Sequence, residues 1–567
     1  MDCVAFIKKK IKFFGIDGYI VPKNDEYFSE HSNPDRLKIV SNFTGSAGLA
    51  IILKNENLLF VDGRYTLQSK KESGRKFSIF EISKYSIKKI LKIKNELTLG
   101  YDPNVFSKNF IETNFPNNCS LFPINENLID SHLMNKKILP SKKFYSIENK
   151  KICESSKSKI KKILNFMMKN KIDNIFISAQ ENVAWLLNIR GNDNPNSPIP
   201  NCRLILTKEK KIYFFSEITK STPLKKMEYL KNINFFSEQD FYSVLIRLNG
   251  TNFSIDSNSC SIFSEGLINS KFKIINRVDP CYKLKSIKTN REIKQTIKAH
   301  IADGVALTKF LYWMKNTKNF NLSEIDAIKK LDKFRKKNKN YLYPSFETIA
   351  GSGPNGAIIH YNARKSTCRK IQKKDIFLCD SGGQYKFGTT DVTRTICFQK
   401  PAEKIKKIFT MVLKGHISLS TSAIKKKTTG SQLDKKARFW LNSIDLDYPH
   451  GTGHGVGFFL NVHEGPNSFS RFNNTIIDKG MIMSNEPGYY EKGKFGIRIE
   501  NLIYVDTRND KKYFKNLTLV PIDKDLINFR YLDNKEKKYL KYYNRFIYNK
   551  LHIYLNEKEK KWLKNLF

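Results

Sequence analysis

Five candidate metal ligands at strand ends and turns fall between residues 380 and 500 of this 567-residue chain. They are two aspartates, one histidine and two glutamates: Asp380, Asp391, His454, Glu486 and Glu500. A set rich in oxygen with a single nitrogen suits a pair of divalent first-row ions better than one zinc ion or an iron–sulfur cluster. Each lies in a local context that aims it inward, so we expect the chain to fold around this group.

Asp380 and Asp391 belong to a predicted β-hairpin. Asp380 follows the apolar run 376–379, which is typical of a short buried strand. Asp391 opens a second strand over 391–396. Residues 382–388 between them begin with two adjacent glycines and have turn chemistry. A hairpin of these strands would bring the two aspartates side by side.

The next two candidates lie in a glycine-rich segment and at the end of a strand. Glycines in 450–457 let the backbone approach closely and adopt positive φ, so His450 and His454 can crowd into a packed site. Residues 481–486 predict a strand that Pro-Gly stops, which leaves Glu486 at its end.

The last candidate lies in a stretch, 496–502, that alternates with period two. Arg498 and Glu500 therefore share one face, opposite Ile497 and Ile499. A single acidic residue beside a turn is most often a cap or a solvated group. An acidic residue at the end of an apolar strand needs partners, because buried carboxylates do. Five such residues together indicate a built site.

Six strings of the sequence together resemble one known family. They are 355–361, the Asp380 and Asp391 pair, 450–457, 462–466, 485–488 and 496–501. The pattern closely resembles the pita-bread metallopeptidases, and among them aminopeptidase P, the Xaa-Pro aminopeptidases. The resemblance extends over nearly the whole chain, to the large three-domain form of the family, and weakens in the middle.

The resemblance implies a centre of two divalent metal ions. In it, Asp391 and Glu500 touch both ions. Asp380 binds one, and His454 with Glu486 completes the other. Two such ions share one bridging hydroxide as the nucleophile, and Glu486 also acts as the general base. The family usually takes Mn²⁺, while Zn²⁺ and Co²⁺ accept the same ligands and remain open.

The same resemblance implies the substrate, a peptide with proline at its second position that is cleaved before that proline. His360 and His463 are the candidates for binding it and for stabilising the tetrahedral intermediate. His450 lines the site, Arg498 orients a ligand carboxylate, and Arg64 reaches toward the peptide. The proline nitrogen must be protonated as it leaves, so a general acid is expected as well.

We expect an α/β (α+β) fold of three domains. They are 1–145, 146–288 and 289–567, the last with a helical tail over about 525–567. A strand and a hairpin that occur up to residue 62 are echoed by a strand at 171–177 and a hairpin at 204–215. The two earlier domains resemble creatinase-like N-terminal domains, and the last resembles the pita-bread catalytic domain.

Four further expectations concern single segments. Residue 290 opens a long helix, because Ile293, Ile297, Ile301 and Val305 recur at helical spacing. Residues 345–351 predict a strand that runs into a glycine loop, and 517–522 predict a last strand. The segment 194–200 departs from the more aromatic segment usual in the family, so its contact with substrate stays open.

The net charge of +46 has two explanations. A nucleic-acid partner is one; the codon bias of an AT-rich genome is the other. Lysines occur in every segment, together with many Asn and Ile, and no known nucleic-acid-binding signature appears, so we favour codon bias and expect no specific nucleic acid. No apolar run reaches membrane-spanning length. Nine cysteines without a C-x-x-C pair fit a reducing compartment, so a cytoplasmic protein is expected.

Two other functions remain as alternatives. One is an Xaa-Pro dipeptidase (prolidase) or another pita-bread hydrolase with the same ligands, against which the duplicated N-terminal half and the long tail argue. The other is a non-catalytic peptide-binding module, which predicts missing ligands, whereas all five are present. Creatinase chemistry is disfavoured because that relative works without metal. A homodimer is expected from the resemblance.

Overall fold

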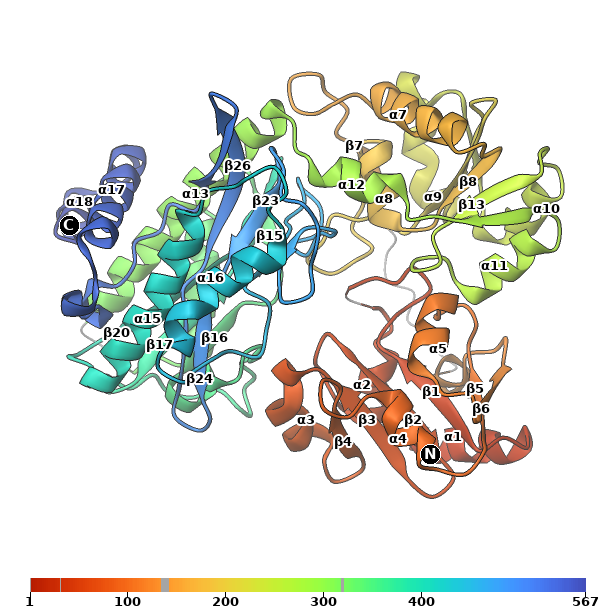
Figure 1. The fold of residues 1–567 in the computed structure, drawn as a ribbon, viewed down its shortest axis with the longest axis horizontal. Helices are drawn as coiled ribbons and strands as arrows, with labels where there is room; N and C mark the ends of the chain where they lie inside the picture. Colours follow the sequence, from red (N-terminus) through yellow and green to blue (C-terminus); the bar gives the residue numbers. More distant parts are fainter. Residues whose placement is uncertain (1, 31, 134–141, 318–320, 567) are drawn as a thin grey trace. The chain divides into compact units, whose positions relative to one another are not determined.

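The structure is a computed structural model that describes residues 2–30, 32–133, 142–317 and 321–566 (Figure 1). The chain separates into two compact units. The first comprises Met1–Lys150 and Glu154–Tyr282, and the second comprises Lys151–Cys153 and Lys283–Phe567. Both units mix helices and sheets, in agreement with the expected fold class.

The first unit contains two six-stranded sheets of the same topology, β4-β3-β2-β1-β5-β6 and β12-β11-β10-β8-β13-β14. In each sheet the three inner strands that carry the hairpin are antiparallel, and the remaining pairs are parallel. The strands are β1 Gly18–Pro22, β2 Gly48–Leu53, β3 Asn57–Val61, β4 Ser78–Glu81, β5 Leu97–Tyr101, β6 Cys119–Pro123, β8 Asn174–Ile177, β10 Arg203–Thr207, β11 Ile212–Phe215, β12 Ile233–Phe236, β13 Asn252–Ile255 and β14 Lys273–Asn276. The repeat predicted from the sequence is thus a repeat of topology.

Helices cover both faces of the first sheet because its strands are apolar on both sides. Ala50 and Ile52 of β2 pack in one core cluster with α1, α2 and α6, whereas Leu49 and Ile51 pack in another with α4 and α5. The helices of this unit, the last of which leads into the second unit, are α1 Cys3–Phe13, α2 Arg36–Ser41, α3 Thr66–Ser73, α4 Ile87–Lys92, α5 Lys108–Asn114, α6 Leu128–His132, α7 Ser156–Lys169, α8 Gln180–Leu186, α9 Ile218–Ser221, α10 Phe241–Leu245, α11 Ile262–Asn269 and α12 Pro280–Ser286. A short pair, β7 Tyr145–Ser146 with β9 Ile189–Arg190, completes it.

The second unit has small sheets and long helices. Its sheets are β15-β18-β19, β16-β17-β20, β21-β22, β23-β26-β27 and β24-β25. The strands are β15 Tyr341–Pro344, β16 Ile349–Ser352, β17 Ile376–Ser381, β18 Gly383–Tyr385, β19 Gly388–Thr389, β20 Val392–Cys397, β21 Gly453–His454, β22 Ser468–Phe469, β23 Ile482–Asn485, β24 Gly488–Glu491, β25 Phe495–Arg498, β26 Asn501–Arg508 and β27 Lys511–Asn516. The helices are α13 Asn290–Asn316, α14 Glu324–Arg335, α15 Glu403–Ser420, α16 Gly430–Asn442, α17 Asn534–Leu551 and α18 Glu557–Lys564.

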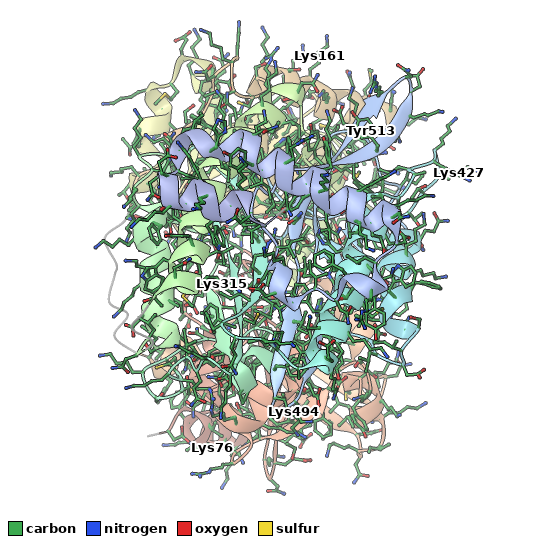
Figure 2. The ribbon with its side chains drawn as sticks, turned by 90° about the vertical axis from the view of Figure 1, so that its left-hand side faces the viewer. Lys76, Lys161, Lys315, Lys427, Lys494 and Tyr513 are labelled. Atoms are coloured by element: carbon green, nitrogen blue, oxygen red, sulfur yellow. The ribbon has the colours of Figure 1, made fainter. Side chains whose placement is uncertain are left out.

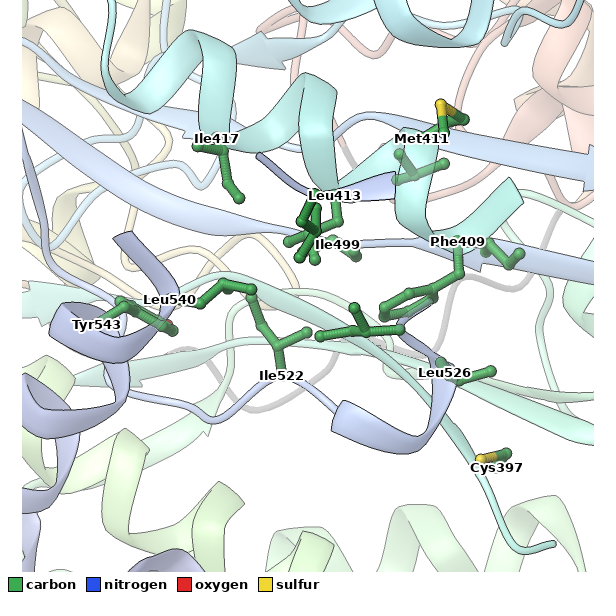
Figure 3. Close-up of a cluster of buried hydrophobic side chains, with 14 of the residues drawn as sticks. Cys397, Phe409, Met411, Leu413, Ile417, Ile499, Ile522, Leu526, Leu540 and Tyr543 are labelled. Atoms are coloured by element: carbon green, nitrogen blue, oxygen red, sulfur yellow. The ribbon is translucent and has the colours of Figure 1, made fainter. Parts of the chain in front are cut away.

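The largest core of this unit joins α15, the strand region before Glu500, and the C-terminal tail. Figure 3 shows Phe409 and Leu413 of α15 near Ile499, with Leu540 and Tyr543 of α17 in the same cluster. The tail helices predicted from the amphipathic pattern are present, and they serve as packing elements. The long helix predicted from residue 290 is α13, whose start Thr289 and Glu292 cap reciprocally.

Two predicted strands of this unit differ from the structure. Over 345–351 only the second half is a strand: β16 begins at Ile349 and runs into the turn Gly353–Ala357, as predicted. Residues 345–348 instead cross from the sheet of β15 to that of β16, where the Ser345 hydroxyl donates to the Thr390 carbonyl. Residues 517–522 are buried but extended outside any ladder, and β27 lies before them. Their carbonyls accept from the side chains of Arg394 and Tyr543 instead of from a neighbouring strand.

The lysines are distributed over both units and not gathered on one element. Figure 2 labels two lysines of the first unit, Lys76, which follows α3, and Lys161, which lies on α7. It also labels Lys427 and Lys494, which lie in loops of the second unit. All four are exposed. This distribution agrees with the codon-bias explanation of the charge. None of the helices in the described part of the chain combines the length and apolar character that crossing a bilayer requires.

Candidate metal centre

The two aspartates lie on neighbouring strands, as the hairpin prediction requires. β17 and β20 pair antiparallel, with Asp380 opposite Thr393. Asp391 immediately precedes β20, so its side chain emerges at the same end of the pair. The intervening β18 and β19 form part of another sheet. The turn chemistry in the sequence therefore marked a crossover between sheets as well as a reversal.

The two glutamates follow strands whose ends are fixed by backbone hydrogen bonds. Glu486 comes directly after β23, and its N–H donates to the Thr452 carbonyl at 2.8 Å. Glu500 lies between β25 and β26, and its N–H donates to the Thr393 carbonyl at 3.1 Å. The predicted single strand over 496–502 is thus interrupted at Ile499 and Glu500.

Four of the five predicted ligands converge. Carboxylate and imidazole atoms of Asp391, His454 and Glu500 lie within 4.8 Å of one another. Nε2 of His454 lies 3.5 Å from Asp391 Oδ2 and 3.5 Å from Glu486 Oε1. Its Nδ1 lies 2.9 Å from the Gly455 carbonyl, which leaves Nε2 facing the carboxylates.

Asp380 joins this group through Arg498. The guanidinium donates to Asp380 Oδ2 at 2.6 Å and to the Thr393 hydroxyl at 3.1 Å. That hydroxyl donates in turn to Glu500 Oε2 at 2.8 Å. Arg498 and Glu500 therefore do share a face, as the alternation predicted, and they meet at Thr393.

The centre holds an excess of buried negative charge. Burial raises the pKa of Asp391 to about 6, and His454 acts against this rise. Burial, with the neighbouring Asp391 and Glu486 carboxylates, raises the pKa of Glu500 well above its usual range. Burial alone would lower the pKa of His454, but Asp391 and Glu486 together raise it to about 9. Such crowding favours a bound cation.

The donor set fits metal ions on a further observation. Oδ1 of Asp380 is buried and has no hydrogen-bond partner among the described residues. Buried carboxylate oxygens ordinarily have one. In contrast, the second metal-like group of the described chain, Cys397 with Asp523 and Asp525, already holds a cation: Lys315 Nζ lies 2.8 Å from each of the two aspartates.

His450 and His463 both lie at this centre. Nε2 of His450 lies 2.9 Å from the Tyr490 hydroxyl, which accepts from Arg498 at 2.6 Å. The rings of His454 and His463 meet edge to face, with centroids 4.2 Å apart. Thr393 and Tyr490 also belong to the site, although neither was predicted. Thr393 follows Asp391 at the period-two spacing that puts both on one strand face, which is the signal in the sequence that points to it.

His360 and Arg64 are described by their local surroundings. His360 is half-buried in the loop after a 3₁₀ turn, Gly353–Ala357, that packs against β25. Arg64 belongs to the first unit, where its guanidinium pairs with Asp62 at 2.7 Å, just before α3. The roles expected for both residues therefore stay predictions.

Sequence profiles of known families match most of the chain. The profile of metallopeptidase family M24 matches residues 294–507. The creatinase/prolidase N-terminal domain is matched twice, at 6–127 and 135–292, and the C-terminal region of M24 peptidases at 512–566. Fold and site thus define a metallopeptidase with two creatinase-type domains before its catalytic domain.

Relatives of similar length refine this class. A probable Xaa-Pro aminopeptidase P of Laccaria bicolor is 34% identical, over 97% of this chain and 90% of its own length. One of Paracoccidioides brasiliensis is 33% identical, over 99% and 98%. The crystal structure of X-prolyl aminopeptidase from Caenorhabditis elegans, described as a cytosolic enzyme with a di-nuclear active site, matches 100% of this chain and 98% of its own, with TM-score 0.92 and 25% identity. This chain belongs to the aminopeptidase P group of metallopeptidase family M24.

A prolidase from Pyrococcus horikoshii is a partial match. It is 28% identical, with a TM-score of 0.52, and although 99% of that chain is matched, it covers only 64% of this one. The aminopeptidase P relatives match almost the whole of this chain, whereas the rest of the chain has no counterpart in the prolidase.

Proposed function

We propose that this chain is a metal-dependent aminopeptidase that hydrolyses the bond between the N-terminal residue and a proline at the second position of a peptide. The convergence of Asp391, His454, Glu486 and Glu500 carries the proposal, with Asp380 joined to them through Arg498. Full-length similarity to proteins named Xaa-Pro aminopeptidase P supplies the substrate class.

Two divalent ions would be held by these five residues, and Mn²⁺ is the metal we propose. The proposal is supported by the oxygen-rich donors, by Oδ1 of Asp380, which has no partner within the described ranges, and by the di-nuclear site of the nematode relative. When bound, such ions lower the pKa of water and polarise the substrate carbonyl.

Glu486 is the proposed general base. Oε1 of Glu486 accepts from the Ser484 hydroxyl at 3.1 Å, which orients the carboxylate and leaves Oε2 to take a proton from the attacking water. His463, beside His454, and His360 are proposed to bind the substrate and to donate hydrogen bonds to its developing oxyanion. A protonated group must also donate a proton to the proline nitrogen as this nitrogen leaves.

Arg498, His450 and Arg64 are proposed to position ligands or substrate. Arg498 holds Asp380 by a charge-assisted hydrogen bond and contacts Tyr490 with its other arm, and Tyr490 in turn meets His450. This chain of contacts fixes the orientation of the Asp380 carboxylate. Arg64 is proposed to reach toward the peptide.

Hydrolysis of Arg-Pro-Pro tests the proposal. Free arginine is followed with metal-stripped protein, after Mn²⁺ is restored, and with Glu486→Ala. Manganese-dependent release that the variant loses is the expected result. Cleavage of Ala-Pro, but not of the tripeptide, would instead establish a prolidase. Metal binding without turnover of either would refute this substrate class, and failure to bind metal would leave a peptide-binding module.

Cytoplasmic location, homodimer formation, the absence of a specific nucleic-acid partner and domain boundaries at 145 and 288 are part of the proposal. The cytosolic nematode relative supports the location. The distributed lysines argue against one nucleic-acid surface. The two equivalent sheets of the first unit support a division near residue 145.

A further inference from the structure

A buried ion pair lies next to the candidate centre, outside the predicted ligands. Nζ of Lys288 donates to Oε1 of Glu464, and each side chain is only 1% exposed. Lys285, also buried, has its Nζ 3.8 Å from Oε2 of the same glutamate. Removing such charges from water costs so much that a buried pair contributes little net stability. A role beyond stability therefore has to be considered.

Glu464 closes a loop that has a histidine beside each end. Its N–H donates to the Gly455 carbonyl at 2.8 Å, and Nδ1 of His454 lies 2.9 Å from the same carbonyl. His463, the neighbour of Glu464, has its ring centroid 4.2 Å from that of His454. Closure of the loop 455–464 thus decides how the two rings meet.

The Glu464 carboxylate rests against the inside of this loop. A Cβ added at Gly457 would lie 3.0 Å from Glu464 Oε2 and 2.7 Å from Leu460 Cβ, so the backbone passes directly over the carboxylate. The Gly457 N–H donates to the Asn461 carbonyl at 2.9 Å. The charge of Glu464 is therefore enclosed by the loop, with Lys288 bonded to one carboxylate oxygen and Lys285 near the other.

Lys288 connects this loop to the strand that precedes Glu486. Its N–H donates to the Gly480 carbonyl at 3.0 Å, in the turn before β23. The Val456 N–H donates to the Ile482 carbonyl of β23 at 3.1 Å. The side chain of Lys288 holds the far end of the loop, while its backbone holds the base of β23.

We propose that Glu464, through its ion pair with Lys288, is a positioning residue that fixes the His463 ring against His454. The proposal rests on the proposed function, in which His463 contacts the substrate. Since a misplacement of about 1 Å can cost about 100-fold in rate, Glu464→Gln is expected to lower kcat by about 10- to 100-fold and to change KM by less than about 3-fold.

Glu536→Gln is the matched control. Glu536 pairs with Lys414 at 2.6 Å, with side chains 9% and 5% exposed, and links α17 to α15. Both variants leave a buried lysine without its carboxylate, so both lose stability, and glutamine retains the capping position of Glu536. Only Glu464→Gln should lose kcat. Equal losses of kcat in both folded variants would overturn the proposal.

A second measurement does not depend on activity. Diethyl pyrocarbonate labelling of metal-free protein, mapped by mass spectrometry, should show a changed rate at His463 in Glu464→Gln and an unchanged rate in Glu536→Gln. An unchanged rate at His463 in both would overturn the proposal. If the wild type fails to cleave Arg-Pro-Pro, the proposed function falls, whereas this labelling still decides the positioning role.

Should Glu464→Gln fail to fold, a double variant removes both charges at once. Lys288→Met with Glu464→Gln removes both charges of this pair and leaves the buried Lys285, which lies 3.8 Å from Oε2 of Glu464 in the wild type, beside a neutral amide. One buried charge fewer remains unpaired than in Glu464→Gln alone, so the double variant is expected to fold. It should show the same loss of kcat and the same change in labelling. Wild-type kcat in the folded double variant would overturn the proposal, because the pair would then serve stability alone.

Discussion

Arg498 is buried, and its charge serves three partners at once. The guanidinium donates to Asp380, to Thr393 and to Tyr490. Its planar fork can reach all three, whereas a lysine ammonium is a point donor on a flexible stem. Arg498 is therefore the residue that orients Asp380. Asp380 is the predicted ligand that reaches the others through Arg498 and Thr393.

We expect Arg498→Lys to weaken Mn²⁺ binding by about 10- to 100-fold, which is usual when a residue that orients a ligand is lost. The charge is kept, so the loss would report orientation. Titration calorimetry on metal-free protein measures it. Arg369→Lys is the control, because the Arg369 guanidinium is 35% exposed and lies 3.4 Å from Asp375. Equal affinity of Arg498→Lys and the wild type would contradict the prediction.

His416 predicts how stability depends on pH. Burial lowers the pKa of His416 from 6.5 to about 3, with a smaller contribution from the Arg394 charge. Between these values the unfolded chain binds one proton more than the folded one, so unfolding becomes easier as the pH falls below 6.5. The contribution is about 1.4 kcal/mol per pH unit.

In His416→Gln this contribution should disappear. Urea unfolding of metal-free protein at several pH values from 7 to 4 would then give a shallower dependence than the wild type. If the free energy of unfolding depended on pH equally in His416→Gln and the wild type, His416 would be shown to bind its proton in the folded protein as well, against the prediction.

At the scale of elements, close backbone approach decides where the metal-binding segments can run. A Cβ at Gly453 would lie 1.9 Å from the Ser484 carbonyl oxygen of β23. Only glycine at position 453 therefore allows β21 to pass so close to β23. At Gly266, in α11, a Cβ would meet nothing within 4 Å. The two glycines therefore predict opposite effects of the same substitution.

Gly453→Ala should destabilise the protein by about 1–3 kcal/mol, the usual cost of forcing atoms into a packed interior, and should displace His454. Gly266→Ala should stabilise it by about 0.5–1 kcal/mol, because alanine restricts the unfolded helix segment. Chemical unfolding monitored separately for each variant measures both changes. A Gly453→Ala protein as stable as the wild type would disprove the close approach.

Residues 517–522 form no strand, and the reason lies in how elements pack. Their apolar character correctly predicted that they are buried. Ladder pairing depends on a neighbouring backbone, and here Arg394 and Tyr543 fill that place with side-chain donors. Hydrophobic pattern alone cannot separate these two outcomes.

At the scale of the whole molecule, the C-terminal tail completes the catalytic unit. Tyr543, Ile547, Leu551, Leu555 and Leu563 lie in the same core cluster as Ile499. Each buried side chain of this size contributes about 1.5–3 kcal/mol, and a folded domain has a net stability of only about 5–15 kcal/mol. The stabilisation that these tail residues contribute is thus comparable with the entire net stability of a folded domain.

A chain ending at residue 532 is expected to be insoluble or to lose cooperative unfolding. Removing only α18, by ending the chain at residue 556, should leave a folded protein with a lower melting temperature. Calorimetry and far-ultraviolet circular dichroism distinguish these states. A soluble, cooperatively unfolding chain without α17 would show that the tail is not part of this core.

Local sequence was enough to predict the strands beside Asp380, Asp391 and Glu486, and the strand and hairpin that recur in the first unit. These follow from local alternation, glycine and proline, which act over a few residues. Long-range packing settled the rest: that the strand breaks at Glu500, that Thr393 and Tyr490 join the site, that residues 517–522 stay outside a ladder, and that Lys288 meets Glu464. Those contacts join residues that are distant in the chain, and which partners meet depends on how whole elements pack.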